Sequence, residues 1–269
     1  MILLPTEAPA TFQRLTYEDR CQYGAPLVCE LTLPAPQTPA DREKLERWIA
    51  LRGATYAADR HSEYLVFPGD GLHGPRIMLS AVMSSPRSMG EYLQPIQQKR
   101  RYDVQGKKAL GHGFTWRPIR PWEHAAEIHG IIHSTTSRQG RPIATQFDQR
   151  PPNHDFADYI PSGTPEFADI CVGVFAPDGS LAAYLLGKRV GDHVQYDEIM
   201  GHADHLRHDV MYLLHWGFLE TCVASPKPPA CLNYGAWYSG ANHLSPEGGL
   251  NRWKRKVKFV PAYLVLASS

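Results

Sequence analysis

The stretch from Leu181 to Phe218 constrains the fold of this chain more than any other part of the sequence. Its first ten residues are rich in apolar and aromatic side chains, which is typical of a core strand. Gly191-Asp192 favours a tight turn, and residues 193–200 continue as a second strand. After a short polar connection, from Arg207 onward, the apolar residues recur at helical spacing. The sequence therefore predicts a β-hairpin that leads directly into a helix.

The flanking sequence extends this unit in both directions. Before it, the pattern predicts a strand at 113–119, a helix at 121–134 and a strand at 169–175. After it, a Pro-rich connection leads to a strand at 230–234, a helix at 247–256 and a last strand at 259–266.

This order of elements resembles the GNAT acyltransferase fold over residues 113–266. The ending GGLNRWKRKVKFVPAYLVL is especially similar to that superfamily, and to its Fem-type branch, which takes amino acids from aminoacyl-tRNA. In these proteins a helix ending in Lys or Arg returns the chain to a final strand through a "GF"-like step, which here is Lys258-Phe259. The resemblance implies an α/β fold with a mixed, largely antiparallel sheet flanked by helices.

The first 112 residues are expected to form an N-terminal α+β portion packed on a GNAT-like domain at 113–269. A complete second GNAT domain needs more residues than this portion has. Its predicted elements are strands at 27–33, 63–67 and 76–83, and helices at 41–52 and 89–102.

Composition narrows the class of protein. A hydrophobic content of 43% and a charged content of 20% are typical of a globular protein. No apolar run approaches the ~18 residues of a transmembrane helix, so no membrane span is expected. The five cysteines include no CxxC pair, which favours reduced thiols and a cytoplasmic location. A net charge of +1 gives no overall attraction to nucleic acid or membrane.

The resemblance implies a donor site at the start of the helix after the hairpin. GNAT enzymes hold the CoA pyrophosphate there on backbone N–H groups, in a Gln/Arg-x-x-Gly-x-Gly/Ala pattern. Here Val210 and Tyr212 replace the two small residues, and Asp209 places a negative charge where phosphate would lie. Three interpretations of this segment therefore stay open: an ordinary helix start, an unusual CoA site, or a site for a donor other than CoA. The candidate donor-binding residues are Arg207, His208, Asp209 and Lys254.

The resemblance also implies catalytic residues. Glu198, on the strand before that helix, is the candidate base, and strand alternation predicts that it shares a face with Tyr196. His202 is the alternative base, and Tyr238 is the candidate acid, with Tyr234 behind it. His202, His205 and His208 straddle a loop and a helix start, so no metal site is expected.

Acceptor binding is assigned to the loop after the first GNAT-like helix and to the aromatic segment after residue 234. An acceptor such as a small molecule, a peptide or a glycan would meet Arg138, Arg141, Trp237 and Asn242. Each also has a plain structural interpretation, as a solvated loop or a packed aromatic turn.

The densest basic run, residues 252–258, is suited either to phosphates of CoA or tRNA or to simple solvation. On a helix, Arg252, Arg255 and Lys256 share one stripe, and Lys254 lies off it.

The sequence thus predicts an acyltransferase acting on an amine or a hydroxyl. Acyl-CoA is the donor that the superfamily implies, although the helix start argues against ordinary CoA binding. Aminoacyl-tRNA is the leading alternative donor. A GNAT-like module that binds a ligand or partner without catalysis is a third interpretation, because fold does not fix function. The sequence leaves the oligomeric state open.

Overall fold

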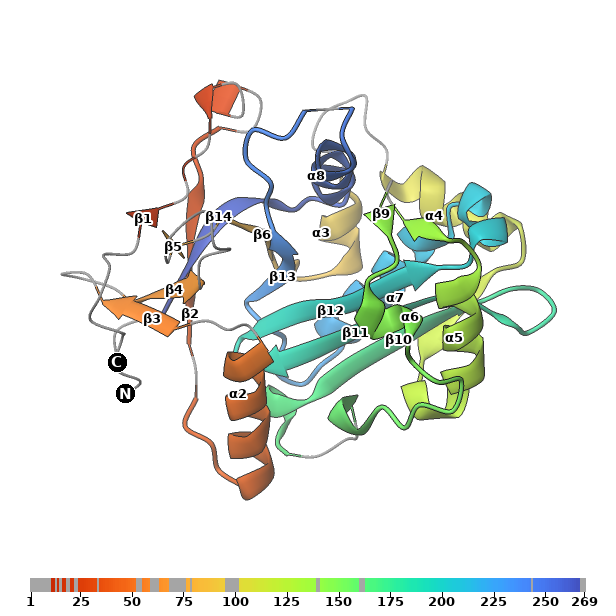
Figure 1. Ribbon diagram of the computed structural model, residues 1–269, viewed down its shortest axis with the longest axis horizontal. Coiled ribbons are helices and arrows are strands. Elements are labelled where there is room, and N and C mark those ends of the chain that lie inside the picture. Colours follow the sequence, from red (N-terminus) through yellow and green to blue (C-terminus); the bar gives the residue numbers. More distant parts are fainter. Residues whose placement is uncertain are drawn as a thin grey trace.

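The computed structural model of the protein describes residues 11–12, 14, 16–17, 20–21, 24–32, 34–51, 55–58, 63–67, 76–77, 79–94, 102–138, 141–159, 163–242 and 244–266. Within this part, a 12-stranded mixed sheet runs through the molecule, and helices lie on both of its faces (Figure 1). The predicted fold class, an α/β protein with a largely antiparallel sheet flanked by helices, is confirmed.

The elements of the second half of the chain agree with the sequence prediction to within a few residues at most ends. They are β7 (Thr115–Pro118), α5 (Ala125–His133), β10 (Asp169–Phe175), β11 (Leu181–Val190), β12 (His193–Gly201), α7 (Val210–Val223), β13 (Cys231–Ala236), α8 (Pro246–Lys256) and β14 (Val260–Leu266). The region after α5, predicted as a loop, also contains a small hairpin of β8 (Ser137–Arg138) and β9 (Arg141–Pro142).

Strand directions identify the GNAT-like arrangement. β7, β10, β11 and β12 follow one another as antiparallel neighbours. β13 lies beside β12 in the parallel direction, and the helix α7 connects the two strands. Their pairing covers only His193–Gln195 and Cys231–Asn233, so the strands separate beyond that point. The hairpin and the helix that leads from it to the next strand were predicted, and this GNAT-like order of elements is confirmed, whereas the separation of the two parallel strands was not predicted.

The sheet continues into the N-terminal portion. β6 (Ser80–Ser84) lies between β13 and β14 and is antiparallel to both, and β2 (Leu27–Leu31) pairs with β14 in parallel. Four short strands complete this end: β1 (Thr11–Phe12), β3 (Thr55–Ala58), β4 (Glu63–Phe67) and β5 (Arg76–Ile77). Because β6 is inserted among GNAT-like strands, the division at residues 112 and 113 stays a prediction.

The helices of the N-terminal portion whose bounds the structure describes are α2 (Pro39–Leu51), α3 (Met89–Leu93) and α4 (Tyr102–Gly111). The predicted helix at 89–102 corresponds to α3, and residues 95–101 lie outside the described part of the chain. α4 was not predicted as a helix. The predicted strand at 76–83 is divided between β5 and β6.

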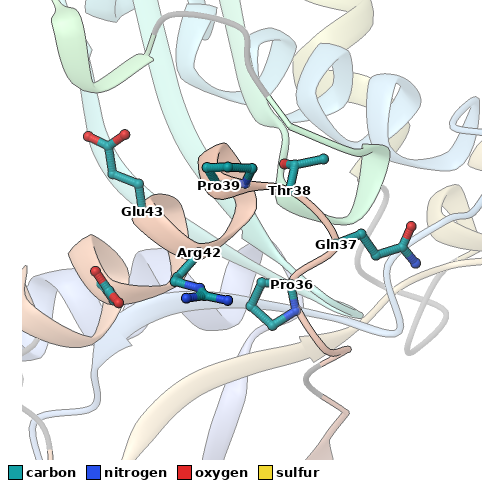
Figure 2. A pocket seen from close by; sticks show the side chains of 7 residues that line it. Pro36, Gln37, Thr38, Pro39, Arg42 and Glu43 are labelled. Atoms are coloured by element: carbon teal, nitrogen blue, oxygen red, sulfur yellow. The ribbon is translucent and has the colours of Figure 1, made fainter.

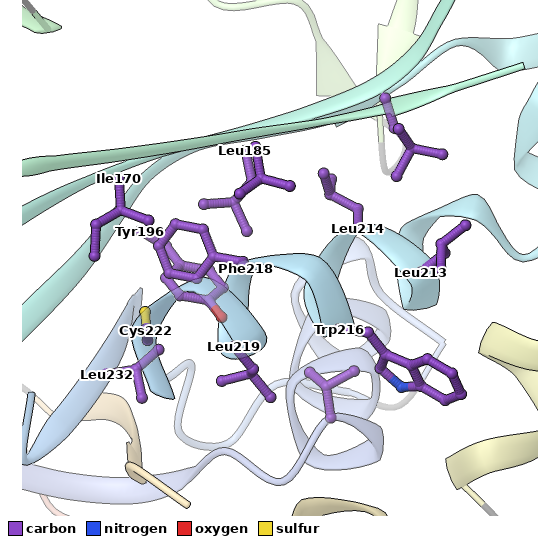
Figure 3. Packing of buried hydrophobic residues seen from close by; sticks show 14 of the residues in the cluster. Ile170, Leu185, Tyr196, Leu213, Leu214, Trp216, Phe218, Leu219, Cys222 and Leu232 are labelled. Atoms are coloured by element: carbon purple, nitrogen blue, oxygen red, sulfur yellow. The ribbon is translucent and has the colours of Figure 1, made fainter. Parts of the chain in front are cut away.

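The main core lies between the sheet and α7. Figure 3 shows Leu185 of β11 beside Leu214 and Phe218 of α7, and all three side chains are fully buried. α7 is apolar around most of its circumference because α3 and α4 cover the side that faces away from the sheet. A second core cluster on the opposite face holds Ile128 and Ile132 of α5 against Leu186.

Gly217 in α7 allows an unusually close approach of helix and sheet. A Cβ atom there would lie 2.5 Å from the ring of Trp116 on β7, and so the ring would have to move. We expect Gly217→Ala to lower the free energy of unfolding by ~1–3 kcal/mol through overpacking. Gly130→Ala in α5 is the matched control, because its Cβ meets no atom within 4 Å. Urea denaturation measures both variants, and equal stability would contradict the close packing.

Candidate functional site

A β-bulge lies in β12 just beyond the point where it separates from β13. Leu186 of β11 pairs with Glu198 and Gly187 pairs with Tyr196, which leaves Asp197 as an extra residue. Tyr196 therefore points into the α7 core, whereas Glu198 lies beside Tyr184 on the opposite face. The prediction that Tyr196 and Glu198 share a face is wrong, because one extra residue reverses the alternation.

A pocket of about 300 Å³ opens where β12 and β13 have separated. Segments distant in sequence converge on it, which is the usual construction of a ligand site. We call it the splay pocket. Its lining residues are Thr135, Ser137 and Arg138 after α5, Ile199, Met200 and Gly201 of β12, Ala203, Leu206 and Met211 before and in α7, Tyr234 of β13, and Trp253 of α8.

Another hollow, of about 290 Å³, lies at the start of α2. Figure 2 shows that its walls come from one continuous segment, residues 36–46. The carboxylate of Asp41 in this segment accepts hydrogen bonds from the backbone N–H groups of Gln37, Thr38 and Thr164. These contacts explain the burial of Asp41 as a helix cap that also ties α2 to the loop before β10. The splay pocket, built from several elements, is the stronger candidate site.

Glu198 does not line the splay pocket. Arg150 holds its carboxylate in a bidentate ion pair, with Nη1–Oε2 at 2.8 Å and Nη2–Oε1 at 2.5 Å, and the hydroxyl of Tyr184 lies 3.3 Å from Oε2. Both charged side chains are about one-tenth exposed, at 11% and 9%. This geometry engages both oxygens and gives no support to the predicted role of Glu198 as the base. The pair instead fastens the segment after α6 (Thr145–Asp148) to β12.

Tyr234, rather than Tyr238, reaches the splay pocket. The side chain of Trp253 forms a hydrogen bond to Tyr234, and burial raises the pKa of this phenol. A phenol with a raised pKa stays protonated at neutral pH and can donate a proton. The backbone of Tyr238 is held by the side-chain amide of Asn251, through Tyr238 N–Oδ1 at 3.2 Å and Nδ2–Tyr238 O at 2.8 Å.

Lys254 points inward from α8 and is only 2% exposed. Its Nζ donates a hydrogen bond to the carbonyl of Ala236 at 2.6 Å and lies 5.0 Å from the ring centre of Tyr234. Burial lowers the pKa of Lys254 to about 7. The lysine thus connects α8 to the end of β13, and its position gives no support to a direct contact with a donor phosphate.

A surface ion pair lies at the start of α7. A 3-10 helix at Ala203–His208 runs directly into Asp209, which has a left-handed backbone with φ of 60°. The Asp209 carboxylate accepts a hydrogen bond from Lys108 of α4 at 3.0 Å. Arg207 is exposed and donates from Nε to His208 at 3.1 Å. Asp209 and Lys108 therefore lie where the resemblance places a pyrophosphate.

The side chains of His202, His205 and His208 do not gather around one point. His202 caps the 3-10 helix by accepting a hydrogen bond from the N–H of Asp204 at 3.4 Å, and its ring lies 5.4 Å from that of His205. His208 stacks near His112 and Phe114 instead. Across the described ranges, no three His, Cys, Asp or Glu side chains are arranged to hold a metal ion.

Of the predicted acceptor-binding residues whose side chains the structure describes, only Arg138 lines the splay pocket. Trp237 is fully buried in the main core, so a substrate cannot reach it in this arrangement. Asn242 is exposed, and its Oδ1 accepts a hydrogen bond from the N–H of Leu244 at 2.9 Å ahead of α8. The side chain of Arg141 lies outside the described part of the structure.

Two further observations bear on binding to nucleic acid and on crossing a membrane. Arg252 and Lys256 are exposed and Arg255 is half-buried on α8, so the predicted basic stripe is at the surface. No described helix combines the length and the apolar character that crossing a membrane requires.

Comparison with known proteins gives matches in structure only. No family model matches the sequence, and no curated protein matches it. A conserved protein of unknown function from Bacteroides thetaiotaomicron is similar at 12% identity and a TM-score of 0.44, over 82% of this chain and 64% of the other. A tandem GNAT protein from the clavulanic acid biosynthesis pathway is similar at 14% identity and a TM-score of 0.41, over 87% and 60%.

L-PGS from Bacillus licheniformis is similar at 11% identity and a TM-score of 0.43, over 86% of this chain and 92% of the other. The chain spans less than two thirds of the length of the first two structures, at 64% and 60%. The assignment of the GNAT-like fold therefore rests on the strand order and directions of this chain itself.

The depressed pKa of Lys254 predicts a pH dependence of stability. An unfolded lysine keeps its proton to a pKa of about 10.4, whereas the folded one loses it near 7. Between these two pH values the unfolded state therefore binds more protons than the folded state. As a result, the contribution of Lys254 to the free energy of unfolding increases as pH rises above 7. We expect the stability of the wild type relative to Lys254→Met to increase from pH 7 to pH 9.

Urea denaturation at both pH values measures this difference. Lys256→Met, exposed on the same helix, is the matched control and should show no such trend. A stability difference between wild type and Lys254→Met that is the same at pH 7 and pH 9 would contradict the burial of this amine.

Proposed function

We propose that this protein transfers an acyl group to an amine or hydroxyl acceptor, and that the acyl end of the donor lies in the splay pocket. The observation that carries the proposal is the separation of β12 from β13 beside that pocket. Beyond Gln195, β12 has no residue paired with β13, so its backbone groups on that edge are not used by a strand. N–H groups in such a position can polarise a carbonyl and stabilise the oxyanion of a tetrahedral intermediate.

Tyr234 is the proposed general acid. It lines the pocket, and burial raises the pKa of its phenol, so the phenol carries its proton at neutral pH. The proposed base is His202, which lies between the pocket residues Gly201 and Ala203 and is half-buried. Its Nδ1 accepts a long hydrogen bond, 3.4 Å, from the N–H of Asp204, so a base role requires that this contact be released. This choice replaces Glu198, whose oxygens are both engaged by Arg150.

Tyr234→Phe removes the proposed proton donor and keeps the ring. We expect the rate of acyl transfer to fall by ~10²-fold or more, with little change in the affinity for the donor. Tyr238→Phe is the comparison, and it should lower the rate less than Tyr234→Phe. Single-turnover kinetics with a labelled acyl donor separate the rate from the affinity. A larger loss in Tyr238→Phe would return the acid role to the residue that the sequence favoured.

A specific observation supports a second candidate function, transfer of an aminoacyl group from tRNA. The Asp209–Lys108 pair lies at the start of α7, where the resemblance implies a CoA pyrophosphate, and α8 presents exposed Arg252 and Lys256. Phosphate contacts release counterions, so RNA binding should weaken steeply with salt. Titration with acetyl-CoA and with charged tRNA across a salt series distinguishes the two donors.

Replacing Arg252 and Lys256 by Ala should flatten the salt slope of RNA binding in proportion to the number of phosphates that these two side chains neutralise. An unchanged slope would remove the support for the RNA donor. Binding without turnover of either donor, under conditions in which acceptor amines and hydroxyls are supplied, would favour a GNAT-like binding module.

A further inference from the structure

We infer that the splay pocket accepts an acyl group with an apolar body and no positive charge, which narrows the donor within the proposed acyl transfer. The inference rests on that proposed function and names the substrate class of the same site. The lining of the pocket and the charge of Arg138 carry it.

The walls that β12, α7 and α8 contribute are mainly apolar. Ile199, Leu206, Met211 and the ring of Trp253 all face the pocket. Burying an aliphatic chain against such walls is favourable by roughly 0.8 kcal/mol per CH₂ group. The polar lining side chains are Thr135, Ser137, Arg138 and the phenol of Tyr234, and none of them carries a negative charge at neutral pH.

Arg138 is the only charged side chain among the described residues of the lining. Its guanidinium donates to the carbonyl of Gly201 at 3.0 Å, to that of Ile132 at 3.4 Å, and to that of Ile131. It also lies 3.5 Å from Oγ of Ser134. These partners are neutral, and no carboxylate of the described residues forms an ion pair with Arg138. Among the described residues, Arg138 therefore has no carboxylate partner within ion-pair distance.

This arrangement discriminates by charge. An ammonium group that enters the pocket loses hydration, meets no carboxylate, and is repelled by the guanidinium. A neutral aliphatic chain loses no charge hydration and is not repelled by Arg138. A terminal carboxylate is attracted by the guanidinium of Arg138. An aminoacyl group with a free α-ammonium fits this lining less well than an ordinary acyl group. The pocket and the start of α7 thus point to different donors, and the pocket is the part that contacts the acyl group.

Gly201 provides a means of changing the pocket without changing its charge. A Cβ at this position would lie 2.7 Å from Sδ of Met211 and 2.9 Å from Cδ2 of Leu206. Both contacts are with ends of flexible side chains, which can move into the pocket and reduce its volume. Gly201→Ala should therefore weaken the binding of an aliphatic acyl chain.

Three thioesters of N-acetylcysteamine test the inference without any nucleotide: hexanoyl, 6-aminohexanoyl, and adipoyl with a free terminal carboxylate. The acyl chains are similar in length and differ in terminal charge. Calorimetry or ligand-observed NMR at pH 7 measures their dissociation constants with the full chain. We expect the hexanoyl and adipoyl thioesters to bind at least about tenfold more tightly than the 6-aminohexanoyl thioester, a difference of ~1.4 kcal/mol.

Variants of Arg138 and Gly201 test whether the difference in thioester affinity arises in the splay pocket. Arg138→Gln should reduce the discrimination between adipoyl and 6-aminohexanoyl thioesters, and Arg138→Lys should keep their order because it keeps the charge. Gly201→Ala should weaken the hexanoyl thioester several-fold, whereas Gly130→Ala, with no atom within 4 Å of its Cβ, should not. Circular dichroism checks that each variant is folded, and the Arg138→Lys result holds even if Arg138→Gln loosens the loop.

Equal binding of the three thioesters, or tighter binding of the 6-aminohexanoyl thioester, would overturn the inference. Binding of none of them would overturn it as well, because the pocket would then hold no acyl chain. Failure of the proposed function looks different. The expected order of affinities would be present, and Gly201→Ala would change it, but no acyl group would move to any amine or hydroxyl acceptor.

Discussion

The site depends on one short parallel ladder. β12 and β13 are joined only through His193–Gln195 and Cys231–Asn233, and their separation beyond that point creates the splay pocket. Neighbouring strands that stayed paired would use their backbone groups on each other and leave no space. The bulge at Asp197 lies just past the last paired residue and turns the end of β12 toward α7 and the 3-10 helix.

Packing on the α7 face holds the strands apart. Tyr196, Tyr234 and Phe259 fill the angle between them, with ring centres 5.1–5.5 Å apart. His215 of α7 lies 2.9 Å from the hydroxyl of Tyr196, and burial lowers the pKa of this histidine to about 3, so it is neutral. Lys254 then fixes α8 to the end of β13. These aromatic contacts fill the space between the two strands on the α7 face with close-packed side chains.

Regular elements were predictable from the sequence because their periodicity is local. β11 was predicted with the bounds that the structure shows, since its apolar run is long and a tight turn follows it. The side-chain directions at Glu198 were not predictable, because one bulged residue reverses the alternation and leaves no mark in composition. The splay pocket itself was not predicted. Arg138 was named and Tyr234 was a second choice, whereas Ile199, Met211 and Trp253 converge through tertiary packing alone.

The central claim is that an acyl chain binds between the separated ends of β12 and β13. A hexanoyl thioester with a terminal diazirine tests it most directly, because irradiation attaches the chain to the residues that it touches. Mass spectrometry of the digested protein should find the label on residues 199–211 or on Trp253, and excess unlabelled hexanoyl thioester should remove it. A label on residues 36–46, where the other hollow lies, or labelling that resists competition, would contradict the account.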